Sequence, residues 1–213
     1  MTIAIDELTV ADEPGTWAAL GFVVEDDRCQ VGGVPIRLAG RDAGRGIVGW
    51  TLHGLASDAL DGLPTQRADE ASSTTEDASA PHPNGITALD HVVAITPALD
   101  RTVAALQAAG LDLRRVREEP TPAGAPRQAF FRLGAVILEV VQAPDDALER
   151  SGGPDGPAFF WGLAFKVADL DATVSHIGED HCSPPRPAVQ PGRRIATFRR
   201  SAGVAVPVAL MTE

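Results

Sequence analysis

His91 and Glu139 are the two side chains whose types and positions best fit chemistry. His91 lies in the apolar run Leu89–Ile95, and Glu139 lies in the apolar run Ala135–Val141. A lone carboxylate among apolar neighbours is costly to bury unless it is paired, protonated or bound to a cation. The pair therefore indicates either half of a metal site or a core histidine hydrogen-bonded to Glu139, and the sequence leaves both interpretations open.

The elements that must position this pair form one compact pattern over residues 86–142. The β-branched run Leu89–Ile95 predicts a buried strand. Thr96 has the side chain of a helix N-cap, and apolar residues at helical spacing continue until Gly110. A further strand over 111–116 and a hairpin follow, so the predicted order is βαβββ.

The predicted hairpin spans residues 128–141, with its turn about Leu133-Gly134. In this register Gln128 lies opposite Glu139, and Phe130 shares the same face of the sheet. Small-molecule sites are mostly apolar and aromatic, with a few polar groups. Gln128 and Phe130 are therefore candidate substrate-binding residues, with ordinary core packing as the alternative.

This region resembles the vicinal oxygen chelate superfamily, which includes glyoxalase I, extradiol dioxygenases and bleomycin and fosfomycin resistance proteins. The residues that carry the resemblance are Leu89-Asp90-His91-Val92-Val93, Asp100, Gly110-Leu111, Phe131-Arg132-Leu133-Gly134 and Leu138-Glu139-Val140-Val141. It implies an α+β fold in which tandem βαβββ modules form a curved mixed sheet around a cleft. Family metal ligands lie on the first and last strands of a module, at His91 and Glu139 here. A divergent glyoxalase-like member is implied, with Glu139 as the catalytic residue.

A second module is predicted over 158–213, with a strand, a helix and a hairpin in the same order. Matching the modules places Leu163 in register with His91, and Val208 in register with Glu139. Both positions are apolar, whereas a tightly held divalent ion needs three or four ligands. The missing ligands would come from elsewhere in the chain, from substrate, from a second subunit, or not at all.

The N-terminal third reads as a shrunken copy of the same pattern, so internal repetition organises the chain. Residues 1–64 are predicted to form a degenerate βαβββ-like unit plus an extra strand and helix. In this copy Glu7 corresponds to His91, and Arg37 corresponds to Glu139. The predicted domains are 1–64, a linker over 65–85, and modules over 86–150 and 158–213. The linker is rich in small, acidic and proline residues, and His82 is interpreted as a solvated residue within it.

Several arginines oppose the overall charge near the C-terminus: Arg186, Arg193, Arg194, Arg199 and Arg200. Pairing Arg200 with Val204 places Arg194 and Phe198 on the apolar face of the second hairpin. A guanidinium holds carboxylate or phosphate in two-point contact. Arg194, Phe198 and Trp161 are therefore candidate substrate-binding residues for an anionic small molecule. The alternatives are arginines that solvate the back of the sheet and aromatic side chains that are simply core.

Composition sets the class of protein. A chain of 213 residues with 44% hydrophobic content can form one large or two small domains. The net charge of -11 disfavours nucleic acid and acidic membranes as partners. No apolar run approaches membrane-spanning length, so a cytoplasmic protein is predicted. Cys29 and Cys182 are expected to be buried thiols, and the composition, with Lys166 the sole lysine, is typical of a high-GC bacterium.

Three functions remain open. The first is a metal-dependent lyase, isomerase or dioxygenase with one divalent ion (zinc, nickel, manganese or iron) on His91 and Glu139. The second is a metal-free protein that binds or sequesters a small molecule in the cleft between the modules. The third is a scaffold that has lost the site. The sequence fits a protein without a cofactor as well as one with a metal, and it is compatible with a homodimer.

Overall fold

The structure is a computed structural model that describes residues 2–68, 80–121, 124–144 and 153–213. Its chain divides into two compact units. Unit 1 consists of Met1–Asp6, Gly49–Ser73 and His91–Trp161, and unit 2 consists of Glu7–Val48, Thr74–Asp90 and Gly162–Glu213. Each unit combines segments from three parts of the sequence.

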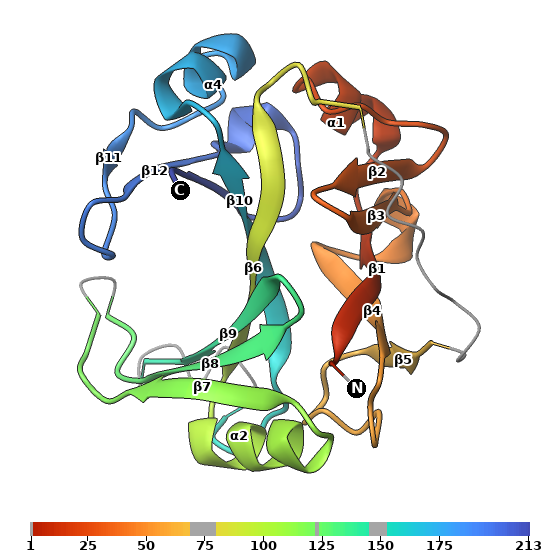
Figure 1. Ribbon diagram of the computed structural model, residues 1–213, viewed down its shortest axis with the longest axis vertical. Helices are drawn as coiled ribbons and strands as arrows, with labels where there is room; N and C mark the ends of the chain where they lie inside the picture. The colour runs from red at the N-terminus through yellow and green to blue at the C-terminus, as the bar shows by residue number, and fades with distance from the viewer. Residues whose placement is uncertain (1, 69–79, 122–123, 145–152) are drawn as a thin grey trace. The chain divides into compact units, whose positions relative to one another are not determined.

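The βαβββ order occurs twice (Figure 1). The first module contains β6 (Ile86–Thr96), α2 (Leu99–Ala108), β7 (Asp112–Arg117), β8 (Gln128–Leu133) and β9 (Val136–Gln142). The second contains β10 (Phe159–Val167), α4 (Leu170–Ile177), β11 (Arg186–Pro187), β12 (Arg194–Thr197) and β13 (Val208–Met211).

Both modules have the same strand pairing. The first strand pairs in parallel with the last strand, and the remaining neighbours are antiparallel. A parallel pair needs a long crossover connection, which the helix of each module helps to form. The predicted α+β class, with tandem βαβββ modules and mixed sheets, is confirmed.

A reduced copy of the module occupies the start of the chain, with β1 (Ala4–Val10), α1 (Pro14–Ala19), β2 (Arg28–Val31) and β3 (Val34–Leu38). Its first and last strands again pair in parallel, with Leu8 opposite Ile36. In the first full module the corresponding pair is Val92 and Leu138. Glu7 and Arg37 thus occupy the places of His91 and Glu139, as the sequence comparison predicts.

The helix expected after the extra strand is absent. That strand, β4 (Ile47–His53), is followed by turns and by the short parallel strand β5 (Thr65–Arg67). Asp61 and Gly62 have φ angles of 51° and 92°, which an α-helix cannot contain. Arg101 binds the Asp61 carboxylate, with 2.8 Å between Nε and Oδ1. Tertiary contacts therefore replace the expected helix with turns, and strand structure continues into the predicted linker.

One face of the unit 1 sheet is largely buried. Six of its side chains are at most 1% exposed: Val92, Ala94, Phe131, Leu133, Leu138 and Val140. Helix α2 contacts β7, β8 and β9 and adds the buried Leu99 and Leu106 (Figure 1). Each large aliphatic side chain contributes about 1.5–3 kcal/mol on burial. Packing on this face holds the strands in register, and the register determines which side chains lie together on the opposite face.

The hairpin register differs from the predicted one by two residues. The turn lies at Gly134 and Ala135, Leu133 pairs with Val136, and Phe130 pairs with Glu139. Gly134 has a φ of 62°, the left-handed conformation that glycine adopts without a steric cost. Because the shift is an even number, each side chain keeps its predicted face.

His82 is a structural residue of unit 2, so its interpretation as a solvated linker residue is wrong. It is 7% exposed, and its ring lies 5.4 Å from that of Phe22. Nδ1 accepts a hydrogen bond of 3.0 Å from the Val23 backbone N–H, and Nε2 lies 3.1 Å from the Gln30 carbonyl oxygen. Nδ1 must therefore be unprotonated, which leaves Nε2–H to donate to Gln30.

We expect unit 2 to lose stability in mild acid because of His82. Burial lowers the pKa of His82 below its ordinary value of 6.5, although the hydrogen bond to Gln30 opposes the shift. The unfolded chain then binds more protons than the folded one, so the stabilising contribution is complete above pH 6.5 and falls as the pH drops below it. Urea denaturation between pH 8 and pH 5 measures the effect, and the slope should be smaller in His82→Gln. Equal slopes in both proteins would contradict the assignment.

Both cysteines are free, buried thiols, as predicted. Burial raises the pKa of Cys29 to about 12, and it raises that of Cys182 to about 11 in spite of the nearby Arg199. A thiol that stays protonated is a poor nucleophile. In the part of the chain that the structure describes, no helix is long and apolar enough to cross a membrane.

Candidate functional site

The half-exposed face of the unit 1 sheet carries the candidate site. Pairing places His91 beside Ile137, Val93 beside Glu139, and Glu139 opposite Phe130. Side chains alternate between the two faces of a strand, so these residues lie on the face opposite α2. The structure therefore brings together His91, Glu139, Gln128 and Phe130, four of the residues that the sequence singled out.

Glu139 is the centre of this group. Its Oε1 accepts a hydrogen bond from the Gln128 side-chain amide, and its Oε2 lies 3.5 Å from His91 Nε2. The Glu139 side chain is 17% exposed, and that of His91 is 14% exposed. The amide N–H of Gln128 stabilises the ionised carboxylate and fixes its orientation. One carboxylate oxygen thus lies near an imidazole on a largely apolar face.

Arg115 is a neighbour of the site that the sequence reasoning missed. It pairs with Phe130 across β7 and β8, and its guanidinium carbon lies 5.1 Å from the centre of the Phe130 ring. A cation over an aromatic face is attracted by about 0.5–1 kcal/mol at an exposed site. The spacing of Arg115 and Arg117, two residues apart in a strand, was the available sign, since it places both arginines on one face. A register shift between Leu113 and Arg115 places Leu113 on the opposite face, where it pairs with Phe131.

The structure corrects the positions equivalent to His91 and Glu139 in the second module. Val92 pairs with Leu138 in the first module, and Leu163 pairs with Val208 in the second. His91 is one residue before Val92, and Glu139 is one residue after Leu138. The equivalent positions in the second module are therefore Gly162, one residue before Leu163, and Ala209, one residue after Val208. Leu163 and Val208 are instead 2% and 4% exposed core residues.

Gly162 leaves no room for a ligand side chain. A Cβ atom added there would lie 2.6 Å from the Pro207 carbonyl oxygen. Among the described residues, no group of three or more His, Cys, Asp or Glu side chains is placed to hold a metal ion. The donors present, His91 and Glu139, are fewer than the three or four that a tightly held ion needs. The described residues therefore do not fit a metal held by this chain alone.

Arg194 is occupied by a salt bridge on the surface. Its two terminal nitrogens donate to the Asp171 carboxylate of α4 at 2.5 and 3.0 Å, and this contact raises the pKa of Arg194. The guanidinium fork is thus filled by a neighbour from the same module. Arg194 shares the hairpin face of the buried Ala196, as predicted, and its role in binding a substrate stays a prediction.

The other two predicted substrate-binding residues lie in different units. Trp161 belongs to unit 1 and is 51% exposed. Phe198 belongs to unit 2, where it forms an isolated bridge with Cys182, and its N–H donates to the Val208 carbonyl at 2.9 Å. Neither residue belongs to the group of four that contains Glu139.

A second imidazole–carboxylate pair lies in the N-terminal part of unit 1. His53 Nδ1 is 2.5 Å from Asp6 Oδ1, and the Asp6 side chain is 8% exposed. Asp6 Oδ2 is buried without a hydrogen-bond partner among the described residues. The contact explains how the Asp6 carboxylate is tolerated inside the sheet.

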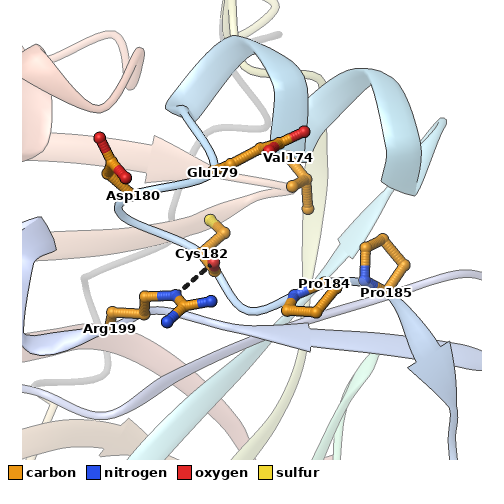
Figure 2. A pocket seen from close by; sticks show the side chains of 7 residues that line it. All are labelled: Val174, Glu179, Asp180, Cys182, Pro184, Pro185 and Arg199. Carbon is orange, nitrogen blue, oxygen red and sulfur yellow. Dashed lines mark hydrogen bonds between the residues drawn. The ribbon is translucent and has the colours of Figure 1, made fainter.

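Unit 2 contains a cavity of about 440 Å³ near the end of α4. Its lining is mixed, with Val174, Glu179, Asp180, Cys182, Pro184, Pro185 and Arg199 (Figure 2). Arg199 Nε donates to the Cys182 carbonyl at 2.7 Å. The lining includes two exposed acids, Glu179 and Asp180, and none of the residues proposed from sequence lines this cavity.

Comparison with known proteins gives likenesses of fold. No protein-family model matches the chain, and no curated protein matches it. Methylmalonyl-CoA epimerase from Mycobacterium tuberculosis aligns with a TM-score of 0.48 and 20% identity, over 60% of this chain and 89% of that chain. A Streptomyces coelicolor methylmalonyl-CoA epimerase aligns with a TM-score of 0.48 and 23% identity, over 60% of this chain and 98% of that chain. A hypothetical protein from Bacillus halodurans C-125 aligns with a TM-score of 0.47 and 15% identity, over 59% and 93%.

Proposed function

We propose that this chain is a vicinal oxygen chelate superfamily protein that binds an organic small molecule on the half-exposed face of unit 1. We further propose that Glu139 exchanges a proton with that molecule. The observation that carries the proposal is the environment of Glu139, a carboxylate that is 17% exposed, held by Gln128 and close to His91. A polar group placed on an apolar, partly open face is the usual composition of a small-molecule site.

The arrangement supports general acid–base chemistry. The ionised carboxylate accepts a proton from a carbon or oxygen of the bound molecule and returns a proton in the reverse step. Gln128 keeps the carboxylate oriented through both steps. Phe130 and the aliphatic side chains of β6 and β9 give the face an apolar lining. A molecule bound on this lining excludes water, which strengthens the electrostatic contacts made there.

Solvent-hydrogen exchange tests this function without knowledge of the reaction. Ligands are first found by thermal shift among hydrophobic acids, dicarbonyls and catechols, and each is then incubated with the protein in D₂O and followed by NMR. Glu139→Gln should still bind the ligand but slow deuterium incorporation by about 10²–10⁴-fold. The control is Glu118→Gln, because Glu118 forms an exposed salt bridge with Arg127. Equal exchange in Glu139→Gln and wild type would overturn the catalytic role.

The second candidate function is a divalent ion shared between the protein and its ligand. The convergence of His91 Nε2 and Glu139 Oε2 favours it. The two donors would need oxygen atoms of the bound molecule to complete the coordination shell. Metal analysis, followed by titration of Mn, Ni, Zn and Fe(II) into wild type and His91→Ala, separates the candidates. Binding that is lost in His91→Ala supports the metal, and binding that is equal in both proteins contradicts it.

A further inference from the structure

Unit 2 contains a cluster of two cations around one carboxylate, formed by Asp90, Lys166 and Arg193. Arg193 Nη1 lies 3.4 Å and Lys166 Nζ lies 3.7 Å from the same atom, Asp90 Oδ1. The side chains are 11%, 31% and 26% exposed for Asp90, Lys166 and Arg193. Charged side chains that are largely withdrawn from water are held in place by such partners.

The backbone fixes all three residues. Asp90 lies in β6, and Lys166 lies in β10, where it pairs with Met211 of β13. Arg193 closes the turn before β12, since Ala188 N–H donates to its carbonyl at 2.9 Å and its own N–H donates to Gln190 at 3.2 Å. Lys166 is thus presented by a strand, and Arg193 is presented by a turn that two backbone hydrogen bonds close.

The cluster carries more positive charge and more donors than Asp90 can use. The three side chains sum to one positive charge, in a chain whose formal net charge is -11. A lysine ammonium has three N–H donors and a guanidinium has five, whereas both contacts fall on one carboxylate oxygen. Partly desolvated donors in excess favour an anion with several acceptor oxygens.

We propose that Lys166 and Arg193, held by Asp90, form a binding site for a carboxylate or phosphate group of a small molecule. Arginine supplies a planar fork, and lysine supplies a point charge beside it, which suits a tetrahedral or planar oxyanion. Asp90 keeps the two cations together while the site is empty. This cluster takes the role that the sequence assigned to Arg194.

The sole lysine of the chain makes the site directly measurable. An amine-reactive acylating reagent labels Lys166, and peptide mass spectrometry gives its labelling rate with inorganic phosphate, succinate or chloride at constant ionic strength. An oxyanion at ten times its dissociation constant should slow labelling about tenfold, because about a tenth of the sites remain free. Protection by phosphate alone or by succinate alone identifies which oxyanion binds. Equal rates in all three salts would overturn the proposal.

Charge variants separate binding from a purely structural role. Arg193→Gln should abolish the protection of Lys166, whereas the control Arg194→Gln should keep it, because Arg194 is paired with Asp171 on the surface. Asp90→Asn removes the competing carboxylate and should increase the affinity for the oxyanion. Unchanged protection in Arg193→Gln, or weaker protection in folded Asp90→Asn, would contradict the site. Glu139→Gln leaves this cluster intact, so the labelling result stands apart from the function proposed for Glu139.

Discussion

Replacing Phe131 with alanine should lower the free energy of unfolding by about 3–5 kcal/mol. Phe131 is 0% exposed and pairs with Leu138 on the buried face of the unit 1 sheet. The truncation removes a large apolar contact and leaves a cavity that close-packed neighbours fill only in part. Urea denaturation followed by far-UV circular dichroism measures the change.

The matched control is the preceding residue of the same strand, Phe130. It lies on the half-exposed face opposite Glu139, so Phe130→Ala should cost only about 1 kcal/mol. The same substitution should weaken ligand binding on that face, because Phe130 supplies its aromatic surface. Similar losses of stability for Phe130→Ala and Phe131→Ala would show that the strand does not present the two faces described.

Replacing Asp12 with alanine should destabilise unit 2 by about 3 kcal/mol. The Asp12 side chain is 0% exposed and accepts three hydrogen bonds. They come from Trp17 Nε1 at 3.3 Å, Ala205 N at 2.6 Å and Val206 N at 3.5 Å. Without the carboxylate these donors are left buried and unpaired, which costs more than the bonds contribute in the folded state.

Asp12→Asn is the informative control, because its side-chain oxygen can still accept from one backbone N–H. It should retain part of the lost stability. Amide hydrogen exchange gives a local readout, with faster exchange at Ala205 and Val206 in Asp12→Ala. Unchanged exchange at these two amides would contradict the role of Asp12 as their acceptor.

The second hairpin shows how a contact distant in sequence overrides a local pattern. The apolar run 204–210 predicts a strand that pairs from Val204 onward, yet β13 begins at Val208. Ala205 and Val206 donate their N–H groups to Asp12, which leaves neither available to β12. Pro207 cannot donate to a ladder either. Ala196 consequently pairs with Leu210, two residues from the predicted partner but on the predicted face.

Arginine and histidine roles depended most on the tertiary structure. The place of Arg194 in the hairpin predicts contact with a substrate, but its guanidinium group is paired with the Asp171 carboxylate. Arg193 and Lys166 gather around Asp90, a residue about 75 to 100 positions earlier in the chain. Long charged side chains reach several ångströms, so their partners follow from which backbones lie close together. The burial of His82 could not be predicted for the same reason. The residues around it in the sequence show no apolar pattern, and its contacts with Val23 and Gln30 come from a distant part of the chain.

The sequence by itself determined the module order, the buried thiols and the face on which each strand residue lies, because the period of two along a strand is a local property. It also determined that His91, Glu139, Gln128 and Phe130 share a surface. Only the tertiary structure decided the hairpin registers, the loss of a helix after β4 and the partners of the charged side chains. Those outcomes rest on long-range contacts whose free energy exceeds local preference, and no single segment encodes them.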